Sequence, residues 1–400
     1  MSTASGDEGN GASAQATELD APRVPLTRIA REWTRIGFTG FGGPPAHIAL
    51  LRQLVVDREG WIDARAFQDA NAACGLLPGP ASTQLSIFCA YRLGGPLGAL
   101  VGGLGFIAPA VVLIIALSML FLAHSTPLWV RGAGAGAGAA VAAVAVQAAR
   151  GLLGPSYQQV RANRPRSARW LAYLAASAAA AVLIGPFLVL VLLACGSCEL
   201  LVQRRPTSLR APSIIVFGAT LARGGLASLC WTALKVGALS FGGGFVIVPL
   251  MQGDAVHTYH WMSNARFLDA VALGQVTPGP VVATIAAVGY AAHGILGAVV
   301  AALVAFTPSF AFILVGGPRF ERIRGSANAR AFLDGAGPAA IGAILGAAVT
   351  LALALHEGWQ FGVLAAAAVV MLVLGRGVVM TLVGAGAVGV IAALAGAPLG

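Results

Sequence analysis

Long apolar stretches limit what this chain can fold into. A helix needs roughly 20 apolar residues to cross a bilayer, and five nearly uncharged stretches reach that length: 96–123, 128–149, 170–201, 295–316 and 332–355. The chain is 58% hydrophobic and only 10% charged, whereas soluble domains carry about 25% charged residues. A soluble protein of this composition would aggregate. We therefore predict an all-α polytopic membrane protein embedded in a lipid bilayer.

The formal net charge of +10 raises the question of nucleic acid binding. The arginines lie in short connections between the apolar stretches, which is how a bilayer sorts them, so we expect no nucleic acid partner. Residues 1–22 are polar and acidic and lack the basic start and apolar core of a signal peptide. We expect a disordered N-terminal tail and a multi-pass protein of the cell inner membrane.

An internal duplication is the most informative pattern in the sequence. Segments 35–80 and 235–280 align without a gap, each residue matching the one 200 positions further on. The matches join Phe41-Gly42-Gly43 to Phe241-Gly242-Gly243, Trp61 to Trp261, Pro78-Gly79-Pro80 to Pro278-Gly279-Pro280, Gly94 to Gly294 and Phe106 to Phe306. A single register for separate motifs indicates a repeat. We predict a first repeat at 23–205, a connector at 206–223 and a second repeat at 224–400.

Arginine placement predicts that the repeats insert in opposite orientations. The connection 150–169 holds five arginines, whereas its counterpart 356–360 holds none. The bias is reversed one connection earlier, because 123–127 has no Arg or Lys and 319–330 has four arginines. Since Arg and Lys gather in cytoplasmic loops, the pattern indicates inverted-topology repeats. Inversion requires an extra crossing between them, for which 213–222 is the only candidate, and the total is roughly 10–13 membrane segments.

Four short Gly and Pro motifs interrupt the helices, because Gly is permissive and Pro lacks an amide donor. Irregular backbone persists in a bilayer only where protein buries it or where it lines a wet cavity. We therefore predict a substrate site between Gly/Pro-broken helices near the midplane. Its backbone comprises Gly40, Phe41, Gly42, Gly43, Pro44, Pro78, Gly79, Pro80, Ser240, Phe241, Gly242, Gly243, Gly244, Pro278, Gly279 and Pro280. For one motif alone, a plain kink or tight helix packing would be sufficient explanation.

The helices that begin after Pro80 and Pro280 suit an anion. Helix N-termini offer free amides and the positive end of the helix dipole. Ser82, Thr83 and Gln84 in the first repeat, and Thr284 in the second, add side-chain donors in the first turn. His47, just past the first break, is a weaker candidate for the same site.

Charged residues within apolar segments are costly and often functional. Arg35 and Lys235, the only lysine, precede the first break of each repeat by about six residues. We expect them to attract the anion, with Asp69 and Asp269 as their counter-ions or as carriers of a coupling proton. A structural ion pair, or snorkelling of the long side chain to the interface, is the alternative.

The order of these motifs resembles the chromate ion transporter family. Phe-Thr-Gly-Phe-Gly-Gly-Pro at 38–44 is followed by Leu-Pro-Gly-Pro at 77–80, and the pair recurs at 239–244 and 277–280. The plan is similar to the long-chain, two-domain members from about residue 25 to the C-terminus. The resemblance implies gradient-driven export of chromate, with sulfate as a related anion, and attaches function to the Gly/Pro motifs. Gly244 replaces Pro44 and Ser240 replaces Gly40 in the second repeat, so equal substrate contact by both repeats stays open.

Other functions remain open on the residues alone. The same scaffold suits sulfate or another anion, since any tetrahedral dianion needs several donors and a cation. An integral membrane enzyme would need clustered acidic residues, and Asp57, Glu59 and Asp63 form the only such cluster. The sequence has no Walker loop or HExxH motif, so we expect no enzyme activity, cofactor or metal. Small residues around 132–140 suit a homodimer but can equally pack within one chain.

Overall fold

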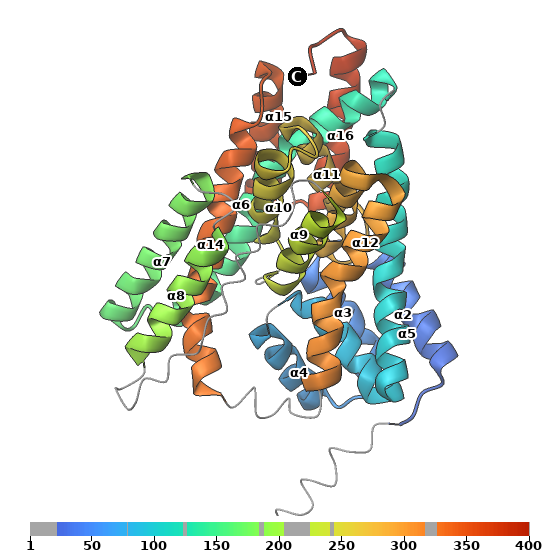
Figure 1. Cartoon of the computed structure of the whole chain (residues 1–400), viewed down its shortest axis with the longest axis vertical. Helices are drawn as coiled ribbons and strands as arrows, with labels where there is room; N and C mark the ends of the chain where they lie inside the picture. Colours follow the sequence, from blue (N-terminus) through green and yellow to red (C-terminus); the bar gives the residue numbers. More distant parts are fainter. Residues whose placement is uncertain are drawn as a thin grey trace, which may run out of the picture.

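The described part of the chain is built of helices. The computed structural model describes residues 22–77, 79–122, 126–183, 188–203, 225–240, 244–316 and 326–399. These residues form helices joined by short turns, and no β-strand occurs among them (Figure 1). The predicted tail, the connector and the candidate crossing at 213–222 lie outside the described residues, apart from Pro22. The all-α fold is confirmed.

Both repeats contain the same series of helices. The first has α2 (Leu26–Thr39), α3 (Pro44–Arg52), the π-helical η1 (Gln53–Arg58), α4 (Ala64–Leu76), α5 (Ala81–Phe121), α6 (Leu128–Gln158), α7 (Arg164–Leu183) and α8 (Leu188–Gln203). The second has α9 (Leu226–Ala238), α10 (Ile247–Gln252), the π-helical η3 (Gly253–Thr258), α11 (Asn264–Val276), the 3₁₀ helix η4 (Val281–Thr284), α12 (Ile285–Gly316), α14 (Ala327–Leu353), α15 (Gly358–Ala368), η6 (Val369–Val373) and α16 (Val378–Leu394). The π-helical turns η1 and η3 lie at equivalent places in the two repeats, whereas the π-helical η6 has no counterpart among the described residues of the first repeat.

The long helix of each repeat folds back on itself at a glycine. Gly95 in α5 has φ 65° and ψ −157°, and Gly294 in α12 has φ 62° and ψ −150°. These angles favour glycine, because a Cβ is strained in the left-handed region. The two arms of α5 lie against each other, with Gly98 directly beside the carbonyl oxygen of Ala90. A short arm therefore leads from each Pro-Gly-Pro motif to the turn, and a long arm returns.

This turn corrects the register of the duplication. A constant spacing of 200 pairs Gly294 with Gly94, yet the residue with matching backbone angles is Gly95. The short arm of the second repeat begins with 3₁₀ helix η4, which rises about 2.0 Å per residue instead of 1.5 Å. Its 281–293 segment therefore reaches about as far as 81–94 with one residue fewer, roughly 21 Å. Beyond the turn the spacing is 199, and Phe106 no longer matches Phe306.

The two repeats run in opposite directions. In Figure 1 the long arm of α5 ends near the top of the molecule and that of α12 ends near the bottom. The next helices also run in opposite directions, because α6 runs from the top to the bottom of the view and α14 from the bottom to the top. The long arms contact each other at the centre, where the Phe310 ring fills the space beside Gly103. The predicted inverted-topology repeats are therefore confirmed.

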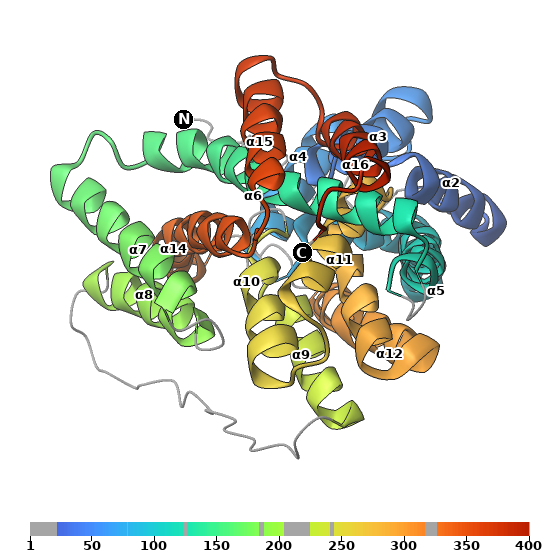
Figure 2. The same cartoon turned by 90° about the horizontal axis from the view of Figure 1, so that it is seen from above.

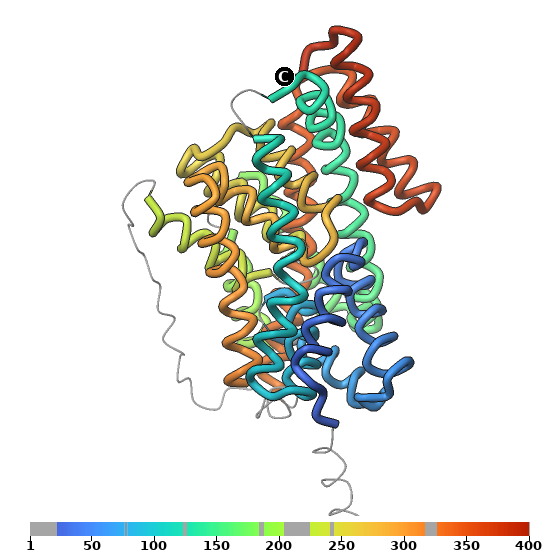
Figure 3. The backbone as a smooth tube through the Cα atoms, turned by 90° about the vertical axis from the view of Figure 1, so that its right-hand side faces the viewer, coloured from blue at the N-terminus to red at the C-terminus, as the bar shows by residue number. Residues whose placement is uncertain are grey.

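Each repeat packs its final helices against the other repeat. The views in Figures 2 and 3 place α15 and α16 alongside α6, and α14 alongside α7 and α8. Small residues allow the close approach, since a Cβ added at Gly132 of α6 would lie 2.6 Å from the carbonyl oxygen of Gly389. The small-residue stripe at 132–140 is thus occupied within the chain, which removes the sequence argument for a homodimer through it.

Four described helices are long and apolar enough to cross a membrane: Ala81–Phe121, Leu128–Gln158, Val281–Gly316 and Ala327–Leu353. Shorter apolar helices accompany them at Leu188–Gln203, Leu226–Ala238, Gly358–Val373 and Val378–Leu394. Helices beside the breaks are too short to cross alone; the 14 residues of α2 extend about 21 Å. The Gly/Pro-broken helices expected of the fold are present.

Candidate functional site

The breaks of the two repeats meet at the centre of the molecule. The amide of Gly279 donates to the carbonyl oxygen of Gly40 at 3.0 Å, which joins a break of the second repeat to one of the first. Gly79 lies against the last turn of α9, where a Cβ built on it would be 3.4 Å from the carbonyl oxygen of Gly237. Each Pro-Gly-Pro motif therefore faces the end of the other repeat's first helix.

The first break depends on Gly40. A Cβ at this position would lie 2.8 Å from both Cδ2 of His47 and the carbonyl oxygen of Ile36. Gly42 and Gly43 follow with φ of 102° and 73°, and Gly43 caps α3, whose first residue is Pro44. The chain reverses here, so that α3 and η1 run back along α2.

His47 is buried inside this reversal and links it to α5. Its Nε2 lies 2.9 Å from the carbonyl oxygen of Gly40, and its Nδ1 lies 3.3 Å from Oγ of Ser82. Because a carbonyl oxygen only accepts, we assign the proton to Nε2 and the Ser82 hydroxyl as donor to Nδ1. The imidazole ring and the Phe106 ring meet edge to face, with their centroids 5.0 Å apart. His47 therefore positions the start of α5 beside the break.

The start of α5 carries a buried hydroxyl without a described partner. Pro80 caps the helix, and Ser82, Thr83 and Gln84 are fully buried or nearly so. The hydroxyls of Thr83 and Ser240 have no hydrogen-bond partner among the described residues. An unsatisfied buried polar group costs about 1–3 kcal/mol, and a helix N-terminus favours negative charge. The arrangement suits an anion.

The start of the second short arm offers less to an anion. Thr284 donates to the carbonyl oxygen of Val281 at 2.7 Å, so its hydroxyl is already satisfied. Pro278, Gly279 and Pro280 are buried, as are all of residues 244–251. Four predicted site residues lie outside the described residues, namely Pro78, Phe241, Gly242 and Gly243.

The two predicted cations lie in different surroundings. Nζ of Lys235 is 2.5 Å from Oδ2 of Asp254, and their side chains are only 14% and 3% exposed. Thr232 donates to the same carboxylate oxygen at 2.7 Å. Arg35 is instead 64% exposed and lies 3.7 Å from Glu32, one turn earlier on α2. The structure therefore does not bring Arg35 and Lys235 to one place.

The expected pairing of Lys235 with Asp269 is wrong. Helix α11 turns Asp269 toward α6, where its carboxylate lies beside Gly134, and η3 supplies Asp254 to Lys235 in its place. Asp269 lines a separate cavity of about 330 Å³ with Arg131, Arg266 and His356. Asp69 lies half-buried on α4, and its role in coupling stays a prediction.

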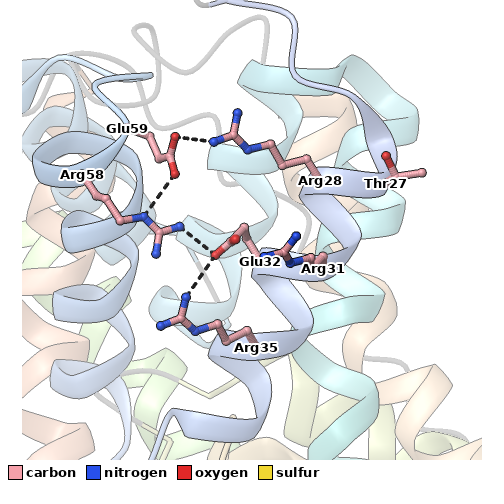
Figure 4. A pocket seen from close by; sticks show the side chains of 7 residues that line it. All are labelled: Thr27, Arg28, Arg31, Glu32, Arg35, Arg58 and Glu59. Atoms are coloured by element: carbon pink, nitrogen blue, oxygen red, sulfur yellow. Dashed lines mark hydrogen bonds and ion pairs between the residues drawn. The ribbon is translucent and has the colours of Figure 1, made fainter.

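The charged residues on the polar face of α2 form a network that sequence reasoning missed (Figure 4). Glu32 accepts from Arg58 at 2.8 Å, and Glu59 accepts from Arg28 at 2.6 Å. Burial alone would raise the pKa of Glu32, but the hydrogen bond and charge of Arg58, with the charge of Arg35, hold it below its ordinary value. Glu32 is therefore ionised at neutral pH. The duplication gave no signal for it, because Thr232 occupies the equivalent position.

Among the described residues, no group of three or more His, Cys, Asp or Glu is arranged to hold a metal ion. Backbone amides and hydroxyls lie at the central junction, and Arg35 and Arg58 line a cavity that reaches Thr39. These are groups that bind anions by hydrogen bonds and charge.

Known proteins share both repeats. The family profile described as chromate transporter matches residues 27–199 and 227–390. A chromate transport protein of Cupriavidus metallidurans is 31% identical over 345 residues, which cover 83% of this chain and 84% of that protein. A chromate transport protein of Pseudomonas aeruginosa is 29% identical over 361 residues, covering 85% and 84%.

A probable chromate transport protein of Synechococcus elongatus is 29% identical over 353 residues, covering 84% of this chain and 87% of its own. No solved structure matches this chain. The matched segments run from the first turn of α2 into α8 and from the first turn of α9 into α16, and therefore contain the helix ends that meet at the central junction. The chain is a member of the chromate transporter family.

Proposed function

We propose that this protein is a secondary active transporter that exports chromate from the cytoplasm across the cell inner membrane. Export is driven by an ion gradient, and sulfate competes with chromate. Family membership and the names of the relatives support chromate as the substrate. The inverted repeats support alternating access, the mechanism typical of this architecture.

One observation carries the placement of the substrate. The start of α5 presents free amides together with the buried hydroxyl of Thr83, which has no partner among the described residues. The equally unpartnered hydroxyl of Ser240 follows α9, the helix whose last turn lies against Gly79. A tetrahedral oxyanion bound there would accept hydrogen bonds from these groups, and its charge would meet the helix dipole. Movement of one repeat against the other would separate Gly279 from Gly40 and expose the site alternately to each side.

Everted membrane vesicles test this function directly, because export then appears as uptake. We expect chromate uptake that depends on a proton gradient and falls when sulfate is added. Absence of uptake by correctly inserted protein would contradict the proposal, and the same vesicles would then be screened with sulfate and other anions.

Two isosteric variants test the placement. Thr83→Val and Ser240→Ala each remove a hydroxyl without adding volume, so each should raise the KM for chromate about tenfold, the equivalent of one lost hydrogen bond to a charged group. Ser177→Ala on α7 is the matched control, because Ser177 is also buried and unpartnered among the described residues. Equal KM values in all three variants would remove the α5 start from the site.

A further inference from the structure

A polar groove leads along α2 toward the first break. An outer cavity of about 730 Å³ is lined by Arg28, Arg31, Glu32, Arg35 and Arg58 among others (Figure 4). An inner cavity of about 470 Å³ shares Glu32, Arg35 and Arg58 with it and reaches Thr39. Thr39 directly precedes Gly40 at the break. The two cavities thus form one arginine groove, defined here by Arg28, Arg31, Glu32, Arg35, Thr39 and Arg58.

The charges of the groove are unbalanced. Arg28, Arg31 and Arg35 share one face of α2 because they are spaced by three and four residues, and Arg58 faces them from η1. The outer cavity holds four arginines and two carboxylates, an excess of two positive charges. Arg31 makes no ion pair with any described residue. In the inner cavity Asp57 is the one further carboxylate, and it lies 3.9 Å from Arg52.

Glu32 holds the position that an anion would take. Its carboxylate is nearly buried and lies between Arg58 at 2.8 Å and Arg35 at 3.7 Å. Charged hydrogen bonds of guanidinium to an oxyanion are among the stronger ones in proteins. A free dianion in the groove would meet the same two arginines, and Arg31 besides. Glu32 is therefore a built-in competitor for them.

The fold does not require these charges. The second repeat has the same helices, yet Ser228, Trp231, Thr232 and Thr258 stand at the positions of Arg28, Arg31, Glu32 and Arg58. The single cation of α9, Lys235, is neutralised by Asp254. Because the same backbone forms without the arginines, they serve something other than folding. Charged groups kept beside membrane helices commonly mark an ion pathway.

We propose that the arginine groove is an outer binding site for a tetrahedral dianion on its way to the break at Gly40, an inference that rests on the proposed function for the identity of the anion. The dianion displaces Glu32 from Arg58 and Arg35, is held by Arg31 as well, and passes Thr39 to reach the start of α5. The phosphate of an anionic lipid has similar chemistry and is the competing occupant.

Equilibrium binding of radiolabelled sulfate to the purified full-length protein in neutral detergent tests the groove without transport. Arg31→Gln removes an exposed cation that holds no ion pair with a described residue, so folding should be unaffected while sulfate binding weakens about tenfold. Glu32→Gln removes the competitor and should tighten binding three- to tenfold, whereas a merely structural role would weaken it. Arg65→Gln, an exposed arginine on α4 outside the groove, should bind within twofold of the unaltered protein.

Three results would overturn the proposal. The first is equal sulfate binding by Arg31→Gln and Arg65→Gln, and the second is weaker binding by Glu32→Gln. The third is loss of sulfate binding in nanodiscs containing phosphatidylglycerol but not in neutral nanodiscs, because the groove would then hold a lipid phosphate. Chromate uptake in vesicles separates the two proposals. If chromate uptake is insensitive to Arg31→Gln, the transport function stands and the groove proposal fails. If sulfate binding depends on Arg31 but no chromate is taken up, the groove binds an anion and the transport function fails.

Discussion

The first breaks of the two repeats have related backbones but different surroundings. In the first repeat Phe41 is 47% exposed and α3 starts near the surface. In the second repeat residues 244–251 are all buried, and Lys235 and Asp254 neutralise each other beside them. The contrast shows that duplication kept the backbone geometry while the side chains diverged. One repeat is open along a charged groove and the other is closed by a neutral pair.

The sharpest test of this comparison is topology, because its outcome is all or none. Reporter fusions at Arg161 and Arg324 should both report the cytoplasm, and a fusion at Glu357 should report the opposite side. The expectation follows from the arginine-rich connections and the opposite courses of α6 and α14. If Glu357 and Arg324 are found on one side, the repeats are not inverted in the membrane.

Removing Lys235 from the second repeat should cost far more stability than removing Arg35 from the first. Lys235→Ala leaves Asp254 charged and buried, a change that costs about 3–5 kcal/mol. Arg35→Ala removes an exposed partner, and such pairs are worth about 1 kcal/mol or less. Unfolding in detergent, followed by helical signal, measures both. The double variant Lys235→Met with Asp254→Leu should recover most of the loss, and equal losses for the two single variants would erase the distinction.

Equivalent positions at the break should respond differently to alanine. Gly40→Ala forces a Cβ to within 2.8 Å of His47 and of the Ile36 carbonyl oxygen, and overpacking of this kind costs about 1–3 kcal/mol. Ser240 already carries a Cβ, and its buried hydroxyl has no described partner, so Ser240→Ala should lose no stability and should gain up to about 1–3 kcal/mol. Thermal unfolding compares them, and a Gly40→Ala variant as stable as Ser240→Ala would show that the junction is looser than described.

The smallest expected difference concerns the turn after η1 and η3. Gly60 has φ 61°, and its equivalent His260 has φ 53°. A side chain in this region costs about 1–2 kcal/mol, partly offset by the greater freedom of an unfolded glycine. His260→Gly should therefore gain up to about 1 kcal/mol, while Gly60→Ala should lose a similar amount. If the free energy of unfolding changes in the same direction in both variants, the two turns are not equivalent.

Much of the fold could be predicted because its signals are local. Apolar length predicts membrane helices, and Gly and Pro act on the backbone at their own positions, so the breaks were located correctly. The arginine asymmetry between connections predicted the inversion. The turns at Gly95 and Gly294 were not foreseen, because a Gly-rich membrane helix gives no local sign of which glycine adopts a positive φ.

The ion pairs could not be predicted from the repeat. Which carboxylate meets Lys235 is decided by the tertiary packing of η3 and α11, and the linear spacing suggested Asp269 instead of Asp254. The search for matched charges also passed over Glu32, whose counterpart is Thr232. Symmetry in the sequence identifies shared backbone roles, whereas the charged groove is visible only where the repeats differ.

The exchange of terminal helices between the repeats has a consequence for biosynthesis. Helix α6 is complete at residue 158, but its partner α16 ends at residue 394. At synthesis rates of about 5–20 residues per second, α6 waits in the membrane for roughly 10–50 seconds before that partner exists. Its glycine-rich face must meet lipid or a chaperone during this interval. The first repeat therefore cannot finish folding on its own, because α16, which is synthesised much later than α6, completes the packing of α6.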